Sequence, residues 1–556
     1  MSGAQDPVLE PLDRTHRVFN QTPALEDFNL YEGDVPLCEG VRREGAVWAE
    51  AELRAHGARC GSAEVIEWGF LANRHKPELL THDRQGHRID RVRYHPAYHE
   101  LMRLGLEAGL HCRVWTEPRP GAQVARAAAC YLQGQVEAGH CCPLTMTFAA
   151  VPVLRGTPAI AEHWLPGVLV RGYDPRDLPA AEKRALTIGM GMTEKQGGSD
   201  VRANTTSAQP LDSGGSGAAY CLVGHKWFMS APMCDAFLML AQAPGGLSCF
   251  LVPRWQPDGS RNGIRLQRLK DKLGNVANAS SEVELQGALG WMLGEEGRGV
   301  ATILEMVALT RFDCIVNSAA AQRQAVAQAV HHAAHRSAFG AALIHQPLMR
   351  NVLADLQLEV EGSLALALRL ARALDHPDDE AERLLLRLGL PVGKYWVCKR
   401  TPGHVYEALE CLGGNGVVEE FIAARLYRDA PINAIWEGSG NIQALDVLRV
   451  LEREPAAVDA WFAELELTAG AEPLLDAAVA GLKAGLTAAD REYRARALVG
   501  QLALTLQASL LVRAGQGAVA EAFIRARLGG GGHLYGDLPA GVNVKVLLER
   551  GRPRPV

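Results

Sequence analysis

Residues 435–441 place one carboxylate, Glu437, between two large apolar residues and a glycine-rich turn. Beside Trp436 this carboxylate can be partly desolvated, which favours its protonated form and raises its pKa. A carboxylate tuned in this way can act as a base toward a proton on carbon. The alternative is a glutamate that only complements the dipole of the helix that follows. The local sequence does not decide between these two readings.

A helix is needed to hold this segment in place. Apolar residues recur at every third position directly after the turn, at Ile442, Leu445, Leu448 and Leu451. This spacing predicts a helix with one apolar face. Asn441, immediately before the series, is a suitable N-cap. We therefore expect Glu437 to lie just ahead of the start of a helix.

Two further segments carry groups that could serve a cofactor. Residues 190–200 form a loop rich in backbone and hydroxyl donors, in which Gly197 and Gly198 allow a ligand to approach the backbone closely. The loop is neither a Walker loop nor a Rossmann fingerprint. Residues 224–230 end a strand with an aromatic pair and a hydroxyl, which could shield a planar cofactor and donate to its ring nitrogen. Read alone, two core aromatics and a surface serine explain the second segment as well.

The overall composition indicates a reduced, cytoplasmic, multidomain protein. The chain has 556 residues, 48% hydrophobic and 22% charged, as in ordinary soluble proteins. Its 12 cysteines include no Cys-x-x-Cys pair, and no His-x-x-x-His cluster is present, so no metal site is expected. Residues 1–13 are acidic and polar without the apolar core of a signal peptide. No run approaches the roughly 20 apolar residues that a membrane span needs.

The charge is distributed unevenly along the chain. The net charge is −6, which argues against a chain that binds nucleic acid along its whole length. From residue 480 to the end there are 11 basic and 5 acidic residues, a net charge of +6, so the rest carries −12. A basic C-terminal module on an acidic body suggests a polyanionic partner. A solvated helix face with a ragged tail would give the same count.

The order of elements predicts a mainly α protein with a central β domain. Residues 1–45 are expected to be irregular and residues 48–165 mostly helical, within an N-terminal part that covers 1–185. Over 186–295, short alternating or apolar runs separated by glycine turns predict an antiparallel barrel or sandwich. Long helices at 299–334, 347–374 and 381–412 indicate an up-and-down bundle over 296–455.

An additional helical module is predicted over 456–556. Its helical block runs over 456–528 and ends at four consecutive glycines, residues 529–532, which stop a helix and allow flexibility.

Taken in order, these segments resemble the acyl-CoA dehydrogenase family, in the branch typified by AidB adaptive-response proteins. The motifs run in family order and spacing, and the N-terminal residues 18–21 and 29–31 match the branch as well. The motifs are MTE at 192–194 with GSD at 198–200, KWFMS at 226–230, KLG at 272–274, LGEEG at 293–297, RSAFG at 336–340 with Gln346, LGGNG at 412–416, and IWEGSGN at 435–441.

The resemblance implies a helical domain, a β domain and a four-helix bundle, usually assembled as a homotetramer, with FAD between the β domain and the bundle. It assigns three groups of residues to FAD, the third partly across a subunit boundary. The first two are Met190, Gly191, Met192, Thr193, Gly197, Gly198 and Ser199, and then Phe228, Met229 and Ser230, with Ser230 near flavin N5. The third is Arg336, Phe339, Gln346, Gly413, Gly414, Ile435, Trp436, Gly438, Ser439, Gly440, Asn441 and Leu445.

The resemblance also implies that Glu437 is the catalytic base. It would remove the acyl α-proton while a hydride passes from the β-carbon to the flavin. Some family members instead carry the base just before an arginine of the bundle, and Thr310, before Arg311, cannot play that part. Val276, Val417 and Trp436 depart from common family residues, and the last two put a usual acyl-CoA fit in doubt.

The AidB-like branch further implies binding of double-stranded DNA in the response to alkylation damage. The basic C-terminal segment agrees with this, and such contacts would be independent of sequence and weakened by salt. The residues expected to contact phosphates are Arg513, Arg525, Arg527 and Lys545. No known DNA-reading motif is present, so we expect no base-specific readout.

Three hypotheses follow from the sequence. The chain is an FAD-dependent dehydrogenase of a short or branched acyl-CoA, such as isovaleryl-CoA, which also binds DNA. Alternatively, it is a DNA-binding flavoprotein with little or no dehydrogenase activity. The third, a helical interaction protein with a vestigial cofactor site, is disfavoured because the flavin motifs and Glu437 occur together.

Overall fold

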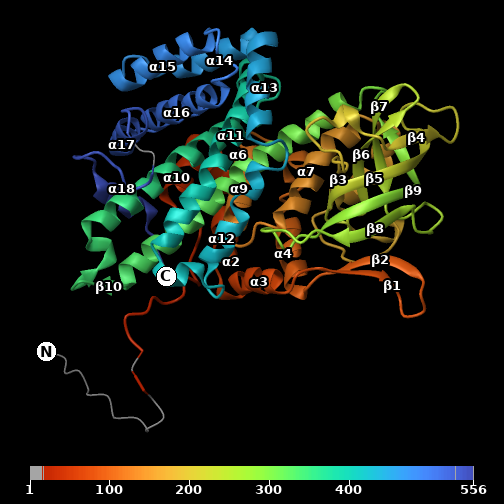
Figure 1. Cartoon of the computed structure of the whole chain (residues 1–556), viewed down its shortest axis with the longest axis horizontal. Coiled ribbons are helices and arrows are strands. Elements are labelled where there is room, and N and C mark those ends of the chain that lie inside the picture. The colour runs from red at the N-terminus through yellow and green to blue at the C-terminus, as the bar shows by residue number, and fades with distance from the viewer. Residues whose placement is uncertain (1–14, 17, 532–533, 555–556) are drawn as a thin grey trace.

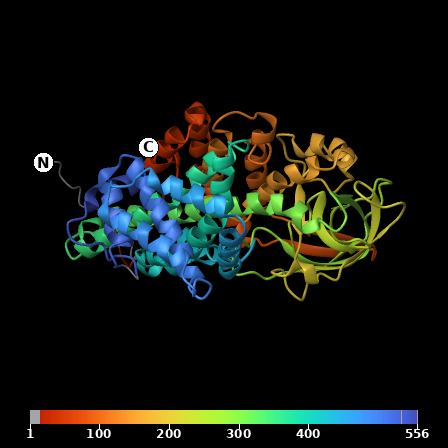
Figure 2. The same ribbon diagram turned by 90° about the horizontal axis from the view of Figure 1, so that it is seen from above.

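The computed structural model describes residues 15–16, 18–531 and 534–554. The β domain forms one end of the molecule and the long helices form its middle (Figure 1). The blue C-terminal helices cover the bundle at the end away from the β domain, as both views show (Figure 2). The sequence predictions for residues 1–13 and for Gly532 lie outside the described residues.

The N-terminal part consists of helices and one hairpin. Helices α6 and α7 are buried over most of their length and pack against the bundle helix α9 (Gly299–His335). The elements are α1 (Val35–Arg43), α2 (Glu50–Cys60), α3 (Ala63–Arg74), β1 (Glu78–His82), β2 (Arg88–Arg93), α4 (Pro96–Glu107), α5 (Arg113–Thr116), α6 (Ala122–Gly134), α7 (Cys141–Arg155) and α8 (Pro158–Val168).

The first 45 residues are not irregular throughout, contrary to the sequence prediction. Helix α1 begins after Asp34, whose carboxylate accepts a hydrogen bond from the backbone N–H of Leu37 at 3.0 Å. Pro36 lies in the first turn, where its missing N–H costs nothing. This short capping signal was present in the sequence but was outweighed by the surrounding polar residues.

The hairpin β1–β2 interrupts the stretch that was predicted to be mostly helical. Asp83 fixes its turn by accepting hydrogen bonds from the backbone N–H groups of Gln85 and His87, each at 2.9 Å. An aspartate that bonds to its own turn in this way favours a tight reversal. The hairpin extends beneath the β domain and contacts β8 (Ile264–Leu269) (Figure 1).

The β domain is a barrel built mainly from antiparallel pairs. Strands β6, β4, β5, β9 and β7 follow one another in the sheet, and the pairing of β6 with β7 closes the circuit, while β3 and β8 attach to it. The elements are β3 (Ile188–Gly191), β4 (Ser207–Pro210), β5 (Ala219–Ser230), β6 (Ala236–Ala243), β7 (Gly246–Pro253), β8 (Ile264–Leu269) and β9 (Ser280–Leu293). The predicted barrel is confirmed, but β3 and β4 pair with β6 in parallel, so it is not purely antiparallel.

Three long helices form the centre of the bundle, close to their predicted ranges. They are α9, α10 (Pro347–Leu374) and α11 (Glu380–Glu410), which pack along one another. A small hairpin joins α9 to α10, and two shorter helices follow α11. These elements are β10 (Ser337–Ala338), β11 (Ala341–Ala342), α12 (Ile422–Asp429) and α13 (Gly440–Arg453). Arg126 of α6 holds Asp313 of α9 in a buried pair at 2.7 Å, which ties the N-terminal part to the bundle.

The C-terminal module is docked on the bundle. Its helices are α14 (Pro455–Glu466), α15 (Pro473–Leu486), α16 (Ala495–Arg513), α17 (Gly517–Arg527) and α18 (Val544–Gly551). Trp461 of α14 is fully buried, and α18 returns to pack against α10. Helix α16 is long and apolar enough to cross a membrane by length and composition, but 72% of its apolar window is buried within the protein.

Candidate active site

Glu437 lies on a sharply turned segment ahead of α13. Its backbone φ is +59°, a conformation that is uncommon and strained for a residue other than glycine, and Gly438 follows with φ of +97°. Three donors hold the turn. Lys394 donates to the carbonyls of Trp436 and Gly438, both at 2.6 Å. Arg311 donates to the Glu437 carbonyl at 3.1 Å, and the Gln443 amide donates to the same carbonyl at 3.0 Å.

The Glu437 carboxylate is directed toward the bundle. Its Oε2 accepts a hydrogen bond from the Thr310 hydroxyl at 2.8 Å. Burial raises the pKa of this carboxyl above its ordinary value, and the Thr310 hydrogen bond with the Lys394 and Arg311 charges oppose that shift. A carboxyl with a raised pKa is what the sequence led us to expect of a base. The hydrogen bond to Thr310 gives the Glu437 carboxylate a partner other than the N-terminus of α13, which was the alternative role left open by the sequence.

The start of α13 differs from the prediction. The helix begins at Gly440 with Ser439 in the N-cap position, and neither Ser439 nor Asn441 makes a side-chain capping bond. Asn441 lies inside the first turn and is exposed, so it is not the N-cap. The helix therefore begins two residues before Ile442, the first apolar residue of the series.

Thr310 is the position for which the family resemblance implied an alternative base. The 2.8 Å bond between its hydroxyl and Glu437 means that a side chain at 310 and the Glu437 carboxylate reach the same region. Thr310 cannot itself be the base. It can instead support the base, because its hydroxyl orients and partly stabilises the ionised Glu437 carboxylate.

Replacing Thr310 by valine is expected to move the pH dependence of catalysis. The hydroxyl favours the charged form of Glu437, so its loss raises the pKa of that carboxyl further. The base would then be ionised only at higher pH, and the acidic limb of kcat/KM would shift toward alkaline pH. Pre-steady-state or steady-state rates over a pH series measure this, with Thr310→Ser as the matched control. An unchanged acidic limb in Thr310→Val would contradict the assignment.

The loop over residues 190–200 is joined to β5 through a buried ion pair that sequence analysis missed. Glu194 is fully buried, and its Oε1 accepts from the Lys226 ammonium at 2.9 Å and the Thr206 hydroxyl at 2.6 Å. Burial alone would raise the pKa of Glu194, but Lys226 and these hydrogen bonds hold it well below its usual range. The Trp227 N–H also donates to the Thr193 carbonyl at 2.8 Å. The sequence shows only a lysine and a glutamate separated by 32 positions, which does not by itself predict that they pair.

The far side of this loop is open. Gly197, Gly198 and Ser199 are exposed, Met190, Met192 and Thr193 are half-buried, and Gly191 is buried. A Cβ at Gly198 would lie 2.3 Å from the Thr193 hydroxyl oxygen, and Gly197 has φ of +133°. Both glycines are therefore required by the turn itself, and they leave backbone groups facing outward.

The end of β5 separates the three residues assigned to the cofactor there. Phe228 is 49% exposed and Ser230 is half-buried, so both can meet a ligand. Met229 is fully buried in the barrel, because alternate residues of a strand face opposite sides, so the contact predicted for Met229 would come from its backbone. The Ser230 hydroxyl lies 3.1 Å from that of Ser280, to which the Lys272 ammonium donates at 3.2 Å.

Cys142 of α7 adds a buried thiol to this part of the protein. Burial is the main cause that raises the pKa of this thiol to about 11, the Glu437 charge raises it further, and a hydrogen bond with Ser230 opposes the rise. The sequence gave no signal for a role of Cys142, which follows Cys141 directly and was assigned with it to the reduced cysteines.

The remaining predicted contacts are spread over the surface. Phe339 is 97% exposed on the β10–β11 turn, where Arg336 donates to the Asn20 carbonyl at 2.6 Å and Gln346 to the Ala338 carbonyl at 3.2 Å. Figure 1 shows this hairpin at the opposite end of the bundle from the β domain. Within one chain, it therefore does not meet the loop over 190–200.

The other residues of the third group lie near Glu437 or on the preceding turn. Gly413 and Gly414 form an exposed turn with φ of +60° at Gly413, and Trp436 is half-buried with its indole N–H on Asn433 at 2.9 Å. The members that are exposed are Ile435, Ser439, Asn441 and Leu445, and those that are half-buried are Gly438 and Gly440.

The four basic residues expected to contact DNA differ in how accessible their side chains are. Arg527 is 8% exposed and pairs with Asp355 at 2.6 Å and Glu359 at 3.2 Å, so it stabilises the docking of the module and cannot reach a phosphate. Arg513 pairs with Glu464 at 2.6 Å. The prediction for Arg527 is therefore wrong. Arg525 and Lys545 stay accessible, with exposed fractions of 34% and 77%.

Among the described residues, no group of three or more His, Cys, Asp or Glu side chains is placed to hold a metal ion. All twelve cysteines are free thiols.

Family models match three successive parts of the chain. Residues 20–175 match the N-terminal domain of the adaptive response protein AidB, 189–288 the acyl-CoA dehydrogenase middle domain, and 297–452 the acyl-CoA dehydrogenase C-terminal domain. Together with the barrel, the bundle and the site between them, these matches define an oxidoreductase of the acyl-CoA dehydrogenase type.

Individual relatives narrow this class. The chain is 54% identical to AidB of Escherichia coli (strain K12) over 448 residues, which are 80% of this chain and 82% of that protein. It is 33% identical to acyl-CoA dehydrogenase family member 11 of Caenorhabditis elegans, over 78% of this chain and 72% of that protein. The crystal structure of Caenorhabditis elegans ACDH-11 in complex with C11-CoA superimposes with a TM-score of 0.82 at 26% identity, covering 98% and 94% of the two chains. The chain thus belongs to the AidB branch of the acyl-CoA dehydrogenase family, whose cofactor is FAD.

Proposed function

We propose that this chain catalyses the α,β-dehydrogenation of a short or branched acyl-CoA, such as isovaleryl-CoA, with Glu437 as the base. The observation that carries the proposal is the setting of Glu437. Its carboxyl is desolvated, which raises its pKa, and it accepts a hydrogen bond from the Thr310 hydroxyl at 2.8 Å. The structure of ACDH-11 with C11-CoA supports an acyl-CoA as the substrate class.

The loop over residues 190–200 and the end of β5 fit a dinucleotide cofactor. Gly197, Gly198 and Ser199 present backbone and hydroxyl donors to the outside, and Phe228 presents an exposed aromatic face. These residues, with Met190, Met192, Thr193 and Ser230, would hold FAD, and Arg336, Phe339, Gln346, Gly413 and Gly414 would hold it from a neighbouring subunit. When bound, FAD supplies the acceptor for the hydride that leaves the substrate β-carbon.

The chain's own residues account for the proton. Glu437 would take the α-proton of the acyl group onto a carboxylate oxygen, in its ionised form. Lys394 and Arg311 fix the backbone on both sides of this residue and, as cations, favour that ionised form. Desolvation raises the pKa of the Glu437 carboxyl and so the basicity of the carboxylate, which lets it act on a weak carbon acid.

Purified protein is expected to be yellow and to contain FAD. Replacing Gly198 by alanine should weaken FAD binding about tenfold or more, because the new Cβ forces Thr193 or the loop to move. Titration of the apoprotein with FAD, followed by fluorescence, measures the affinity. Gly86→Ala, in the exposed turn between β1 and β2, is the control, since its φ of +88° makes alanine unfavourable at a site far from this loop. A colourless protein that takes up no added FAD would contradict the proposal.

We also propose sequence-independent binding of double-stranded DNA by the C-terminal module, in the adaptive response to alkylation. Support comes from the net charge of +6 over residues 480–556 and from the accessibility of Arg525 and Lys545. Arg525 is also tethered, since it donates to the Ala540 carbonyl at 2.6 Å. If dehydrogenation proves absent, this binding would be the main activity.

Reversing the charge of both accessible residues, Arg525→Glu with Lys545→Glu, should weaken duplex binding for every sequence alike. Two phosphate contacts fewer should reduce the slope of log K against log [salt] by about 2. Binding isotherms at several salt concentrations measure the slope. The matched control reverses Arg54 and Lys76, which are exposed on the N-terminal part. An unchanged slope in the first variant would contradict the assignment.

A homotetramer and a cytoplasmic location complete the proposal. The exposure of Phe339 at 97% and Leu348 at 85%, close together at the end of the bundle, supports a subunit contact there. Twelve free cysteines support a reducing compartment.

A further inference from the structure

A cavity of about 170 Å³ lies between the β1–β2 hairpin, α4 and the β domain, and none of the residues assigned to FAD, catalysis or DNA lines it. Part of its wall is apolar, formed by Val92, Met102, Pro143 and Met233. A cavity of comparable volume in an engineered core holds one benzene ring. The space therefore suits a single ring or a short branched chain.

Two stacked tyrosines supply unused hydrogen-bonding groups. The Tyr94 and Tyr98 rings lie 4.2 Å apart with an interplanar angle of 11°, and the residues are only 9% and 4% exposed. Within residues 15–16, 18–531 and 534–554, neither hydroxyl has a hydrogen-bond partner. Tyr173 and Cys234 line the same cavity. A tyrosine hydroxyl without a protein partner can donate to an acceptor on a ligand that enters the cavity.

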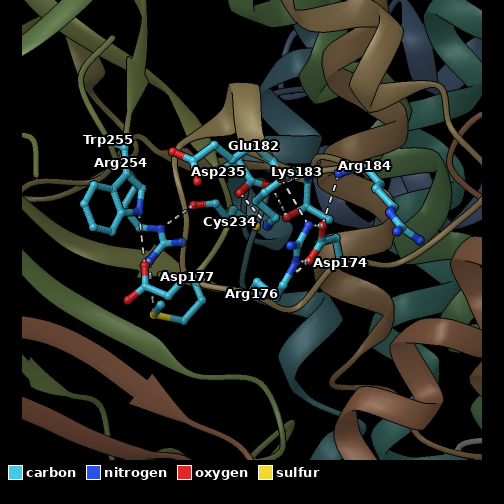
Figure 3. A network of polar contacts seen from close by, with 12 residues as sticks. Asp174, Arg176, Asp177, Glu182, Lys183, Arg184, Cys234, Asp235, Arg254 and Trp255 are labelled. Carbon is cyan, nitrogen blue, oxygen red and sulfur yellow. Dashed lines mark hydrogen bonds and ion pairs between the residues drawn. The ribbon is translucent and has the colours of Figure 1, made fainter. Parts of the chain in front are cut away.

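The charged groups of the inner wall are already neutralised (Figure 3). Each has a partner within the protein at 2.6 Å: Asp174 with Arg176, Asp177 with Arg254, and Lys183 with Asp235. Asp177 also accepts from Arg261 at 2.8 Å. These acids therefore do not require a cation from outside.

The mouth of the cavity carries an uncompensated positive charge. Arg91 is exposed, and within the part of the chain that the structure describes it forms no ion pair, whereas its neighbour Arg93 pairs with Glu78. Arg91 and His99 both line the cavity, and the His99 ring packs edge-on against Tyr94 and Tyr98. A positive charge at this position attracts an anion.

We propose that this cavity binds a small organic carboxylate with one aromatic ring or a short branched chain. The carboxylate would accept from the Tyr94 and Tyr98 hydroxyls under the attraction of Arg91, and the apolar part would pack on Met102 and Met233.

The cavity borders the candidate active site without including it. Pro143 and Ala231, which line the cavity, directly follow Cys142 and Ser230 in the chain. The proposed ligand is thus separate from the acyl-CoA, and the inference does not depend on the dehydrogenase activity.

Calorimetric titration of the full-length, FAD-loaded protein with benzoate and isovalerate tests the proposal, with benzamide as the neutral counterpart of benzoate. We expect saturable binding of at least one of the two carboxylates, and benzamide at least about tenfold weaker than benzoate. Tyr94→Phe with Tyr98→Phe keeps both rings and should weaken carboxylate binding about tenfold, whereas Tyr493→Phe, on an exposed residue, should not. Arg91→Ala should weaken benzoate binding and leave benzamide unchanged.

Failure of both carboxylates to bind wild-type protein would overturn the proposal, as would benzamide binding as tightly as benzoate. Equal carboxylate affinity in the double Phe variant and in Tyr493→Phe would also overturn it. If thermal unfolding shows that the double variant does not fold, the comparison of benzoate with benzamide and the Arg91→Ala variant decide the question, since neither requires a change in the buried ring pair.

Discussion

Replacing Glu437 by glutamine should reduce kcat for acyl-CoA dehydrogenation by about 10²–10⁴-fold, the range that a positioned general base contributes. The amide keeps the size of the side chain and can still accept from the Thr310 hydroxyl, which lies 2.8 Å from Oε2. It cannot take the α-proton. FAD content and thermal stability should therefore stay close to those of the wild type, and the loss should appear in the chemical step. Steady-state rates with a dye acceptor measure it.

A second substitution can show that the lost group is a base. Because Thr310 and Glu437 reach the same region, Thr310→Glu introduced into Glu437→Gln should recover part of the lost activity. Thr310→Gln in the same background is the control, since it fills the same space without a carboxylate. A Glu437→Gln enzyme that keeps its activity within about tenfold of wild type would rule out this role for Glu437.

Replacing Lys226 by methionine should destabilise the protein by about 3–5 kcal/mol, because it leaves the Glu194 carboxylate buried without its countercharge. Lys226 is 1% exposed and donates to Glu194 at 2.9 Å and to the Leu240 carbonyl at 2.8 Å. The pair also joins the loop over residues 190–200 to β5, so FAD affinity should fall in parallel. Urea denaturation and FAD titration measure the two effects.

The double variant Lys226→Met with Glu194→Gln provides the control, since it removes both charges and keeps an acceptor for Thr206. Its loss of stability should be clearly smaller than that of Lys226→Met alone. If the single variant loses less than about 1 kcal/mol, the ion pair is not the element that stabilises the loop.

Much of the fold follows from the spacing of apolar residues and from the glycine-rich turns in the sequence. The helices at 299–335, 347–374 and 380–410 lie within two residues of their predicted limits, because long apolar periods are insensitive to tertiary detail. The errors are local. Asp34 starts a helix in a segment that appeared irregular, and Asp83 turns a hairpin inside a helical stretch. The parallel pairing of β3 with β6 depends on which strands meet in space, and no local pattern encodes it.

The candidate site was predictable residue by residue only where a motif marked it. Glu437 and Ser230 were found through motifs, and their roles stay predictions. The Glu194–Lys226 pair required three-dimensional information, since contacts between distant segments leave no periodic signal. Arg527 shows the opposite error, because a count of charges cannot tell an exposed arginine from one paired with Asp355 in the interior.

The central claim is that this chain oxidises an acyl-CoA at its flavin site, and anaerobic single-turnover reduction tests it most directly. The FAD-loaded protein is mixed without oxygen with isovaleryl-CoA and with straight-chain acyl-CoAs, while flavin absorbance and enoyl-CoA formation are followed together. We expect at least one substrate to bleach the flavin, with one enoyl-CoA formed per flavin and with Glu437→Gln inactive. A flavin that stays oxidised with every acyl-CoA, in protein that binds DNA normally, would contradict the claim and favour a DNA-binding flavoprotein without dehydrogenase activity.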